Sequence, residues 1–153
     1  MTATVGERAP DFSLRSQHGE TVARDDLVGT AALVVFFPFA FSGICGSELA
    51  DLRDHREHFD AAGVRVLAVS CDPMYALRVL ADRDGLGFTL LSDFWPHGEA
   101  ARAFGCFDES VGAPLRGSFG LDADGVVRAG LVRGLGERRD VETHLAVAAE
   151  LSA

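Results

Sequence analysis

The sequence has 153 residues, enough for one domain with a hydrophobic core but too few for two ordinary domains, so we expect residues 1–153 to form a single domain. A formal net charge of −9, without any lysine or an arginine-rich patch, argues against nucleic-acid binding, because an acidic protein repels phosphate backbones. No apolar run approaches the roughly 18 residues that cross a bilayer, and the N-terminus lacks the features of a signal peptide, so we expect a cytoplasmic protein without a membrane span.

The first half of the chain alternates strands with helical segments. An early strand starts within residues 10–14, and the continuous apolar run at 31–37 is typical of a central strand buried on both faces. Residues 46–63 are predicted to form a helix that ends at Gly63, and residues 64–70 the next buried strand. The helical face is marked by Leu49, Leu52 and Phe59.

The second half predicts a different order of elements. It comprises a helix at 74–85, a strand at 88–93, a short helix at 97–105, a hairpin at 117–132 and a closing helix at 137–151. The first of these helices ends at Gly85, and the hairpin turns at Asp124 and Gly125. This order of elements is the thioredoxin-like arrangement, and it predicts an α/β fold with a central mixed β-sheet flanked by helices.

Three cysteines, Cys45, Cys71 and Cys106, are the main chemical feature of the sequence. An odd and sparse set in a cytosolic protein argues against a disulfide framework, and the absence of a CxxC motif disfavours both a zinc knuckle and a dithiol reductase. A cysteine in a distinctive setting is a candidate nucleophile, and Cys45 has such a setting.

Cys45 follows a buried strand and lies in the first turn of the next predicted helix, which Ser42 or Gly43 can cap. Free backbone N–H groups and the helix dipole at that position favour a thiolate over a thiol, and the thiolate is the reactive form. Pro38 lacks an N–H group and can shield one side of the sulfur, whereas the Ser42 hydroxyl can both donate to and accept from an oxygen above it. Position alone leaves open the alternative of a purely structural cysteine.

The spacing of Pro38, Ser42 and Cys45 resembles the P-x-x-x-[TS]-x-x-C active-site motif of the peroxiredoxins. Further blocks resemble that family in the same order along almost the whole chain: VGERAPDFSL, LLSDFWPHGEAARAFG, RGSFGLDADGVVR and GERRDVE. The FFPFAFSGIC and SDFWPHG segments are most similar to the one-cysteine AhpE-type peroxiredoxins.

The resemblance implies a thiol-dependent peroxidase. Cys45 would attack the distal oxygen of hydrogen peroxide or an organic hydroperoxide, which yields a sulfenic acid and water or an alcohol, and peroxynitrite would be a further substrate. Arg116 would be the active-site arginine, which stabilises the thiolate and donates to the peroxide while the O–O bond lengthens.

Four further residues receive roles from the same resemblance. Ser42 would hold the peroxide, Pro38 would shield the thiolate, and Glu48 and Arg139 would form a supporting ion-pair network. Most family members carry threonine at the position of Ser42. Serine keeps the hydroxyl but lacks the methyl group that restricts its rotamers, so the hydroxyl is less firmly oriented.

The sulfenic acid must be reduced by a second thiol. The family's resolving position five residues after the nucleophile is Ala50 here, and no cysteine follows Cys106. Cys71 and Cys106 could resolve the sulfenic acid only if they came within disulfide distance of Cys45, and burial as small core residues is the commoner outcome. The preferred interpretation is a one-cysteine cycle with an external thiol, either mycothiol with a mycoredoxin or a thioredoxin, and without a cofactor or metal.

Alternatives remain for function and assembly. A peroxide sensor that relays Cys45 oxidation to a partner protein would use the same first step. In the family, loops near the active site form the dimer contact, so we expect a homodimer in which aromatic side chains near that edge are buried. The candidate aromatics are Phe39, Phe94, Trp95 and Phe104.

Overall fold

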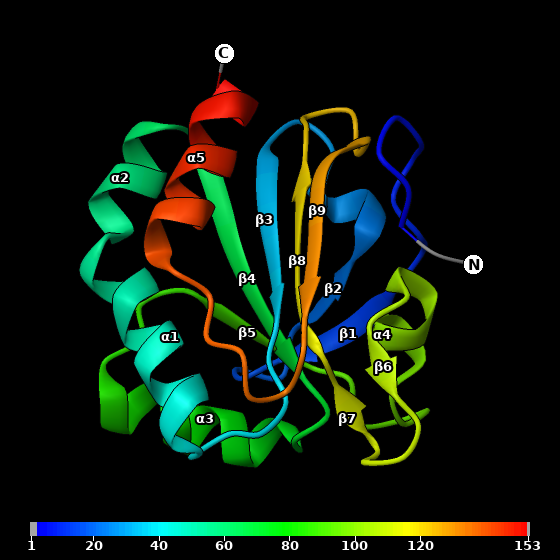
Figure 1. The fold of residues 1–153 in the computed structure, drawn as a ribbon, viewed down its shortest axis with the longest axis vertical. Helices are drawn as coiled ribbons and strands as arrows, with labels where there is room; N and C mark the ends of the chain where they lie inside the picture. Colours follow the sequence, from blue (N-terminus) through cyan, green and yellow to red (C-terminus); the bar gives the residue numbers. More distant parts are fainter. Residues whose placement is uncertain (1–2, 153) are drawn as a thin grey trace.

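The computed structural model describes residues 3–152, and seven strands form one mixed sheet at its centre (Figure 1). The sheet order is β2-β1-β5-β4-β3-β8-β9, and β6 and β7 form a separate two-stranded ladder. The strands are β1 (Ser13–Ser16), β2 (Thr21–Ala23), β3 (Ala31–Phe36), β4 (Val64–Ser70), β5 (Thr89–Ser92), β6 (Phe107–Asp108), β7 (Ala113–Pro114), β8 (Arg116–Leu121) and β9 (Val127–Arg133). The mixed sheet agrees with the prediction from the sequence.

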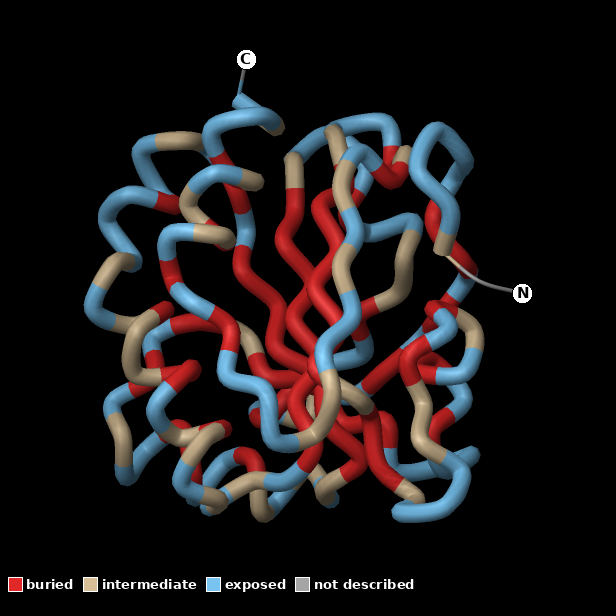
Figure 2. Tube along the Cα trace, in the orientation of Figure 1, coloured by how far each residue is buried: buried red, intermediate tan, exposed pale blue. Residues whose placement is uncertain are grey.

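The three central strands β3, β4 and β5 run parallel, and β8 pairs antiparallel with β3. Along β3, Val34 and Phe36 belong to the core on one face of the sheet, whereas Leu33 and Val35 belong to the core on the other. Burial on both faces explains why this segment is apolar at every position instead of at alternate ones. The central strands accordingly form the most continuously buried part of the chain (Figure 2).

The helices divide between the two faces of the sheet. Residues of α1, α2, α3 and α5 pack with Leu33 and Val35, whereas α4 and the N-terminal segment pack with Val34 and Phe36. The helices are η1 (Arg24–Leu27, a 3₁₀ turn), α1 (Gly43–Asp54), α2 (Arg56–Ala61), α3 (Met74–Asp84), α4 (Glu99–Phe104) and α5 (Val141–Ser152). Within residues 3–152, every helix is too short or too polar to cross a membrane.

Two predicted helix boundaries were wrong. The single helix predicted at 46–63 is two helices, because the chain departs from helical geometry at His55, whose ring Nδ1 lies 2.8 Å from the Asp51 carbonyl oxygen. The closing helix predicted from residue 137 begins at Val141, and residues 137–140 form a loop from which the side chains of Arg138 and Arg139 bind α1. By contrast, Gly85 ends α3 with a positive φ of 63°, as predicted.

The buried ring of Phe36 provides a test of the core. Its centroid lies 5.3 Å from that of Phe104 and 6.0 Å from that of Phe119. We expect Phe36→Ala to lower the free energy of unfolding by about 3–5 kcal/mol in urea denaturation, because it leaves a cavity. The same substitution at Tyr75, which is 72% exposed, should change it by no more than about 0.5 kcal/mol. Equal effects at the two positions would contradict this assignment of the core.

Candidate active site

The sheet brings Cys45 and Arg116 to one edge although 71 residues separate them. Strand β3 ends at Phe36, and residues 37–42 lead from it into α1, which carries Cys45 in its first turn. Because β8 runs antiparallel to β3, with Val35 paired to Ser118, the first residue of β8 lies at the end of β3 from which α1 departs. That first residue is Arg116.

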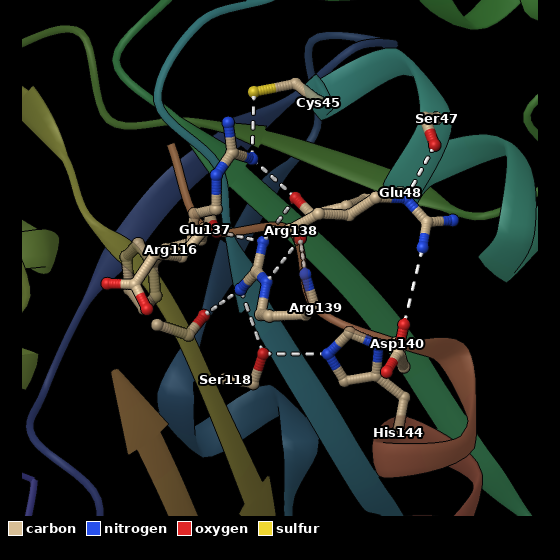
Figure 3. A network of polar contacts seen from close by, with 12 residues as sticks. Cys45, Ser47, Glu48, Arg116, Ser118, Glu137, Arg138, Arg139, Asp140 and His144 are labelled. Atoms are coloured by element: carbon tan, nitrogen blue, oxygen red, sulfur yellow. Dashed lines mark hydrogen bonds and ion pairs between the residues drawn. The ribbon is translucent and has the colours of Figure 1, made fainter. Parts of the chain in front are cut away.

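The Cys45 side chain is fully buried, at 0% exposure, and its sulfur contacts a guanidinium (Figure 3). Arg116 Nη1 donates to Cys45 Sγ at 3.3 Å. The sulfur also lies at the N-terminus of a twelve-residue helix that has no acidic residue in its first turn. A guanidinium donor and the positive end of the helix dipole both favour an anionic sulfur at this position.

Glu48, one turn after Cys45, joins two arginines. Its Oε1 accepts from Arg116 Nη1 at 2.5 Å, and its Oε2 accepts from Arg139 Nε at 2.9 Å and from the Arg139 backbone N–H at 2.8 Å. Burial disfavours the charged form of this carboxyl. Hydrogen bonds and charge from Arg139, together with the charge of Arg116, outweigh burial and hold the pKa of Glu48 below its ordinary value of 4.5.

Arg139 uses all of its guanidinium donors. Besides Nε, its Nη1 donates to Gly117 O and Ser118 Oγ, both at 2.9 Å, and its Nη2 donates to Phe36 O at 2.8 Å and Glu48 Oε1 at 3.0 Å. These bonds account for the five N–H groups that a guanidinium carries. The side chain therefore connects α1, β3 and β8 at one buried point.

The charges of this buried group do not cancel by themselves. Arg116 and Arg139 are each 3% exposed and Glu48 is 2% exposed, so two guanidiniums face one carboxylate away from water. A thiolate at Cys45 brings the formal charge of the group to zero, whereas a neutral thiol leaves one buried positive charge unbalanced. Unbalanced buried charge is strongly unfavourable in a protein interior.

Pro38 and Ser42 lie on the connection between β3 and α1. Pro38 is buried, and Ser42 occupies the N-cap position of α1. The Ser42 side chain does not cap the helix, however, since its hydroxyl donates to Phe39 O at 2.9 Å. Its proton is therefore already engaged, and only the oxygen lone pairs are available to a ligand. The predicted capping by Ser42 is therefore corrected, because Ser42 occupies the N-cap position but its hydroxyl does not bind the helix N-terminus. The catalytic roles of the six predicted residues remain predictions.

The other two cysteines are buried and form no disulfide. Burial, followed by the negative charges of Asp93 and Asp72, raises the pKa of Cys71 to about 12. Burial also raises the pKa of Cys106. Both side chains are therefore thiols of low reactivity in this structure.

Sequence reasoning missed several residues that hold the site together. Leu135 O accepts from Arg116 Nε at 2.7 Å, and the loop residue Arg138 forms an ion pair with Asp51 of α1. Ser118 and His144 extend the network beyond Arg139. The signal for His144 was its spacing: together with Val141 and Ala148 it occupies the buried face of α5, where a polar side chain requires a partner.

Comparison with known proteins identifies the group to which this chain is related. The model of a family described as the AhpC/TSA family matches residues 5–130. The chain belongs to the AhpC/TSA family. It is accordingly a peroxiredoxin, a thiol peroxidase, and the resemblance predicted from the sequence is confirmed.

Individual relatives of this peroxiredoxin support the same conclusion. Alkyl hydroperoxide reductase E of Mycobacterium tuberculosis is 43% identical over 137 residues, which cover 89% of this chain and 90% of that protein. Alkyl hydroperoxide reductase C of Staphylococcus aureus is 32% identical over 139 residues, which cover 88% and 72% of the two chains. The solved structure of AhpC from Enterococcus faecalis has a TM-score of 0.88 at 28% identity and covers 99% of this chain and 93% of that one. The predicted thioredoxin-like fold is thereby confirmed.

The lowered pKa of Glu48 gives this peroxiredoxin a specific acid sensitivity. The contribution of Glu48 to the free energy of unfolding is complete above about pH 4.5 and is lost as the pH falls through its lower pKa in the folded state. We expect Glu48→Gln to cost about 3–5 kcal/mol at neutral pH, since it leaves two buried guanidiniums without their carboxylate. The difference from the wild type should shrink below about pH 4.5 in urea denaturation.

The matched control is Glu57→Gln, which replaces an exposed glutamate of α2 in the same way. It should change stability by no more than about 0.5 kcal/mol throughout the acid range. A Glu48→Gln difference that stays constant or grows as the pH falls would contradict the assigned ionisation of Glu48.

Proposed function

We propose that this peroxiredoxin reduces hydroperoxides through direct attack by Cys45. The observation that carries the proposal is the contact of 3.3 Å between Arg116 Nη1 and Cys45 Sγ inside a buried group whose charges balance only with a thiolate. The thiolate attacks the distal oxygen of the hydroperoxide, and the O–O bond breaks. An S–O bond forms, the hydroxyl group stays on sulfur as a sulfenic acid, and the alkoxide or hydroxide that leaves takes up one proton.

Arg116 is proposed as the group that stabilises the charge that moves onto the departing oxygen. Its Nη1 already faces the sulfur, and its Nε is held by Leu135 O at 2.7 Å, so the guanidinium needs little reorganisation. Ser42 is proposed to accept a hydrogen bond from the peroxide, because its own proton is donated to Phe39 O. Pro38 is proposed to shield the thiolate without offering it a donor.

An external thiol is proposed to complete the cycle. Cys71 and Cys106 are buried thiols with raised pKa values, which disfavours either as the internal reductant. Two external thiols would return Cys45 to its reduced form and release one water and one external disulfide. The candidates are mycothiol with a mycoredoxin, or a thioredoxin. Because Cys45 is fully buried, a bulky reductant cannot reach its sulfur without a local movement of the chain.

Hydrogen peroxide, organic hydroperoxides and peroxynitrite are the proposed substrates. Organic hydroperoxides receive support from the relatives, which are named alkyl hydroperoxide reductases. The three proposed substrates share an O–O bond, which is the bond that the proposed reaction breaks.

Substitution of Cys45 and Arg116 tests the proposed chemistry. We expect Cys45→Ser to abolish peroxide consumption with an external thiol, and Arg116→Ala to slow it by on the order of 10²-fold or more, because a charged donor to the reacting atoms is lost. The control Cys71→Ser should retain the wild-type rate. Mass spectrometry after one equivalent of peroxide should locate a sulfenic acid adduct at Cys45.

Three outcomes would change the proposal. Full activity of Cys45→Ser would exclude it, and an internal disulfide to Cys71 or Cys106 would replace the external thiol. A single oxidation without sustained turnover, followed by a stable complex with a partner protein, would favour a peroxide sensor over the enzyme.

We also propose that the protein is a homodimer that buries exposed aromatic side chains. Trp95 is 81% exposed, Phe94 50% and Phe39 46%, whereas Phe104 lies in the core. Aromatic side chains are enriched at protein–protein interfaces relative to the rest of the protein surface.

Light scattering coupled to size exclusion tests this assembly. We expect the mass of a dimer for the wild type and of a monomer for the double variant Phe94→Ser, Trp95→Ser. The control Val28→Ser removes an exposed apolar side chain at the end of η1 and should remain dimeric. A monomeric wild type would exclude the proposed dimer.

A further inference from the structure

Two buried residues outside the predicted site, Ser118 of β8 and His144 of α5, continue the polar network away from Cys45 (Figure 3). Ser118 Oγ lies 2.9 Å from Arg139 Nη1 and 2.8 Å from His144 Nε2. Ser118 is 3% exposed and His144 is 2% exposed, so water does not compete for these bonds. Both side chains therefore make these hydrogen bonds in the protein interior.

The direction of these hydrogen bonds follows from the chemistry of the donors. A guanidinium can only donate, so Ser118 Oγ accepts from Arg139 Nη1. The hydroxyl proton then needs its own acceptor, and the other partner of Ser118 is His144 Nε2. Ser118 therefore donates to His144, which makes Nε2 the unprotonated nitrogen and places the ring proton on Nδ1.

The neutral state of His144 follows from its surroundings. Burial, followed by the positive charge of Arg139, lowers the pKa of His144 to about 4, against the opposing charge of Glu48. The groups that act on the ring are Ser118 from β8, Arg139 from the loop before α5 and Glu48 from α1. At neutral pH the ring therefore remains an acceptor and adds no charge to the group around Cys45.

We propose that Ser118 and His144 are positioning residues of the peroxidase site, which fix Arg139 and through it the donor that faces the sulfur. Arg116 Nη1 is shared between Glu48 Oε1 at 2.5 Å and Cys45 Sγ at 3.3 Å, so the position of Glu48 decides how closely that nitrogen can approach the sulfur. Arg139 sets the position of Glu48 through three hydrogen bonds. The orientation of Arg139 depends in turn on Ser118 Oγ, whose lone pairs His144 keeps directed at it.

This inference rests on the proposed function of Cys45, and its test uses variants that leave every predicted catalytic residue in place. Ser118→Ala removes one acceptor from Arg139, and His144→Leu removes the acceptor for the Ser118 proton. In each variant we expect the rate constant for oxidation by peroxide to fall by about fivefold, and the pH midpoint of iodoacetamide alkylation at Cys45 to rise by about half a pH unit. His144→Gln supplies an acceptor near the position of Nε2 and should restore both values.

Ser16→Ala is the matched control, because Ser16 is also 3% exposed and lies in a strand, but its hydroxyl only accepts from the backbone N–H of His18. It should leave the rate and the alkylation midpoint unchanged, even if it lowers stability. A folded Ser118→Ala variant with the wild-type oxidation rate and the wild-type alkylation midpoint would overturn the inference. If His144→Leu does not fold, the Ser118→Ala variant alone decides the test. A wild-type protein without Cys45-dependent peroxide reduction would instead refute the proposed function, so the two failures are distinguishable.

Discussion

The position of one carboxylate between two guanidiniums is the constraint on which the rest of the site depends. Glu48 binds Arg116 on one side and Arg139 on the other, and all three side chains are withdrawn from water. A carboxylate in that setting fixes the direction of both arginines because each must satisfy its N–H groups on the few acceptors within reach. The donor that faces Cys45 is thus positioned by a group that does not itself touch the sulfur.

The topology of the sheet makes this arrangement possible. The end of β3, the start of β8 and the first turns of α1 meet at one edge because β8 is antiparallel to β3 and α1 departs from the end of β3. Arg139 then ties these elements together through Phe36 O, Gly117 O and Glu48. The helix N-terminus and the arginine consequently act on the same sulfur from different elements, and neither depends on a flexible side chain exposed to solvent.

Local patterns were sufficient to predict the main strands and helices and the mixed sheet, for example through the apolar run of β3 and the glycine after α3, but they did not predict the short elements β2, η1, β6 and β7. Arg116 was assigned through the resemblance to the peroxiredoxins and not through a local pattern. The break at His55 could not be predicted, because Leu49, Leu52 and Phe59 are buried in both helices and the apolar pattern continues across it. The Ser42 hydroxyl and the Ser118–His144 pair also escaped prediction, since their partners depend on side-chain directions that spacing does not encode.

The energetics of buried charge indicate why such a network occupies the core. Removing a charged group from water costs on the order of several kcal/mol per ion. A protein with well-packed apolar residues in place of a buried ion pair is often at least as stable. Stability alone therefore does not account for two arginines, a glutamate, a serine and a histidine between α1, β8 and α5. An apolar core of equal volume could not balance the charge of a thiolate or hold a donor against it. The proposed chemistry explains the network better, since two guanidiniums and one carboxylate place an excess of one positive charge beside the sulfur of Cys45.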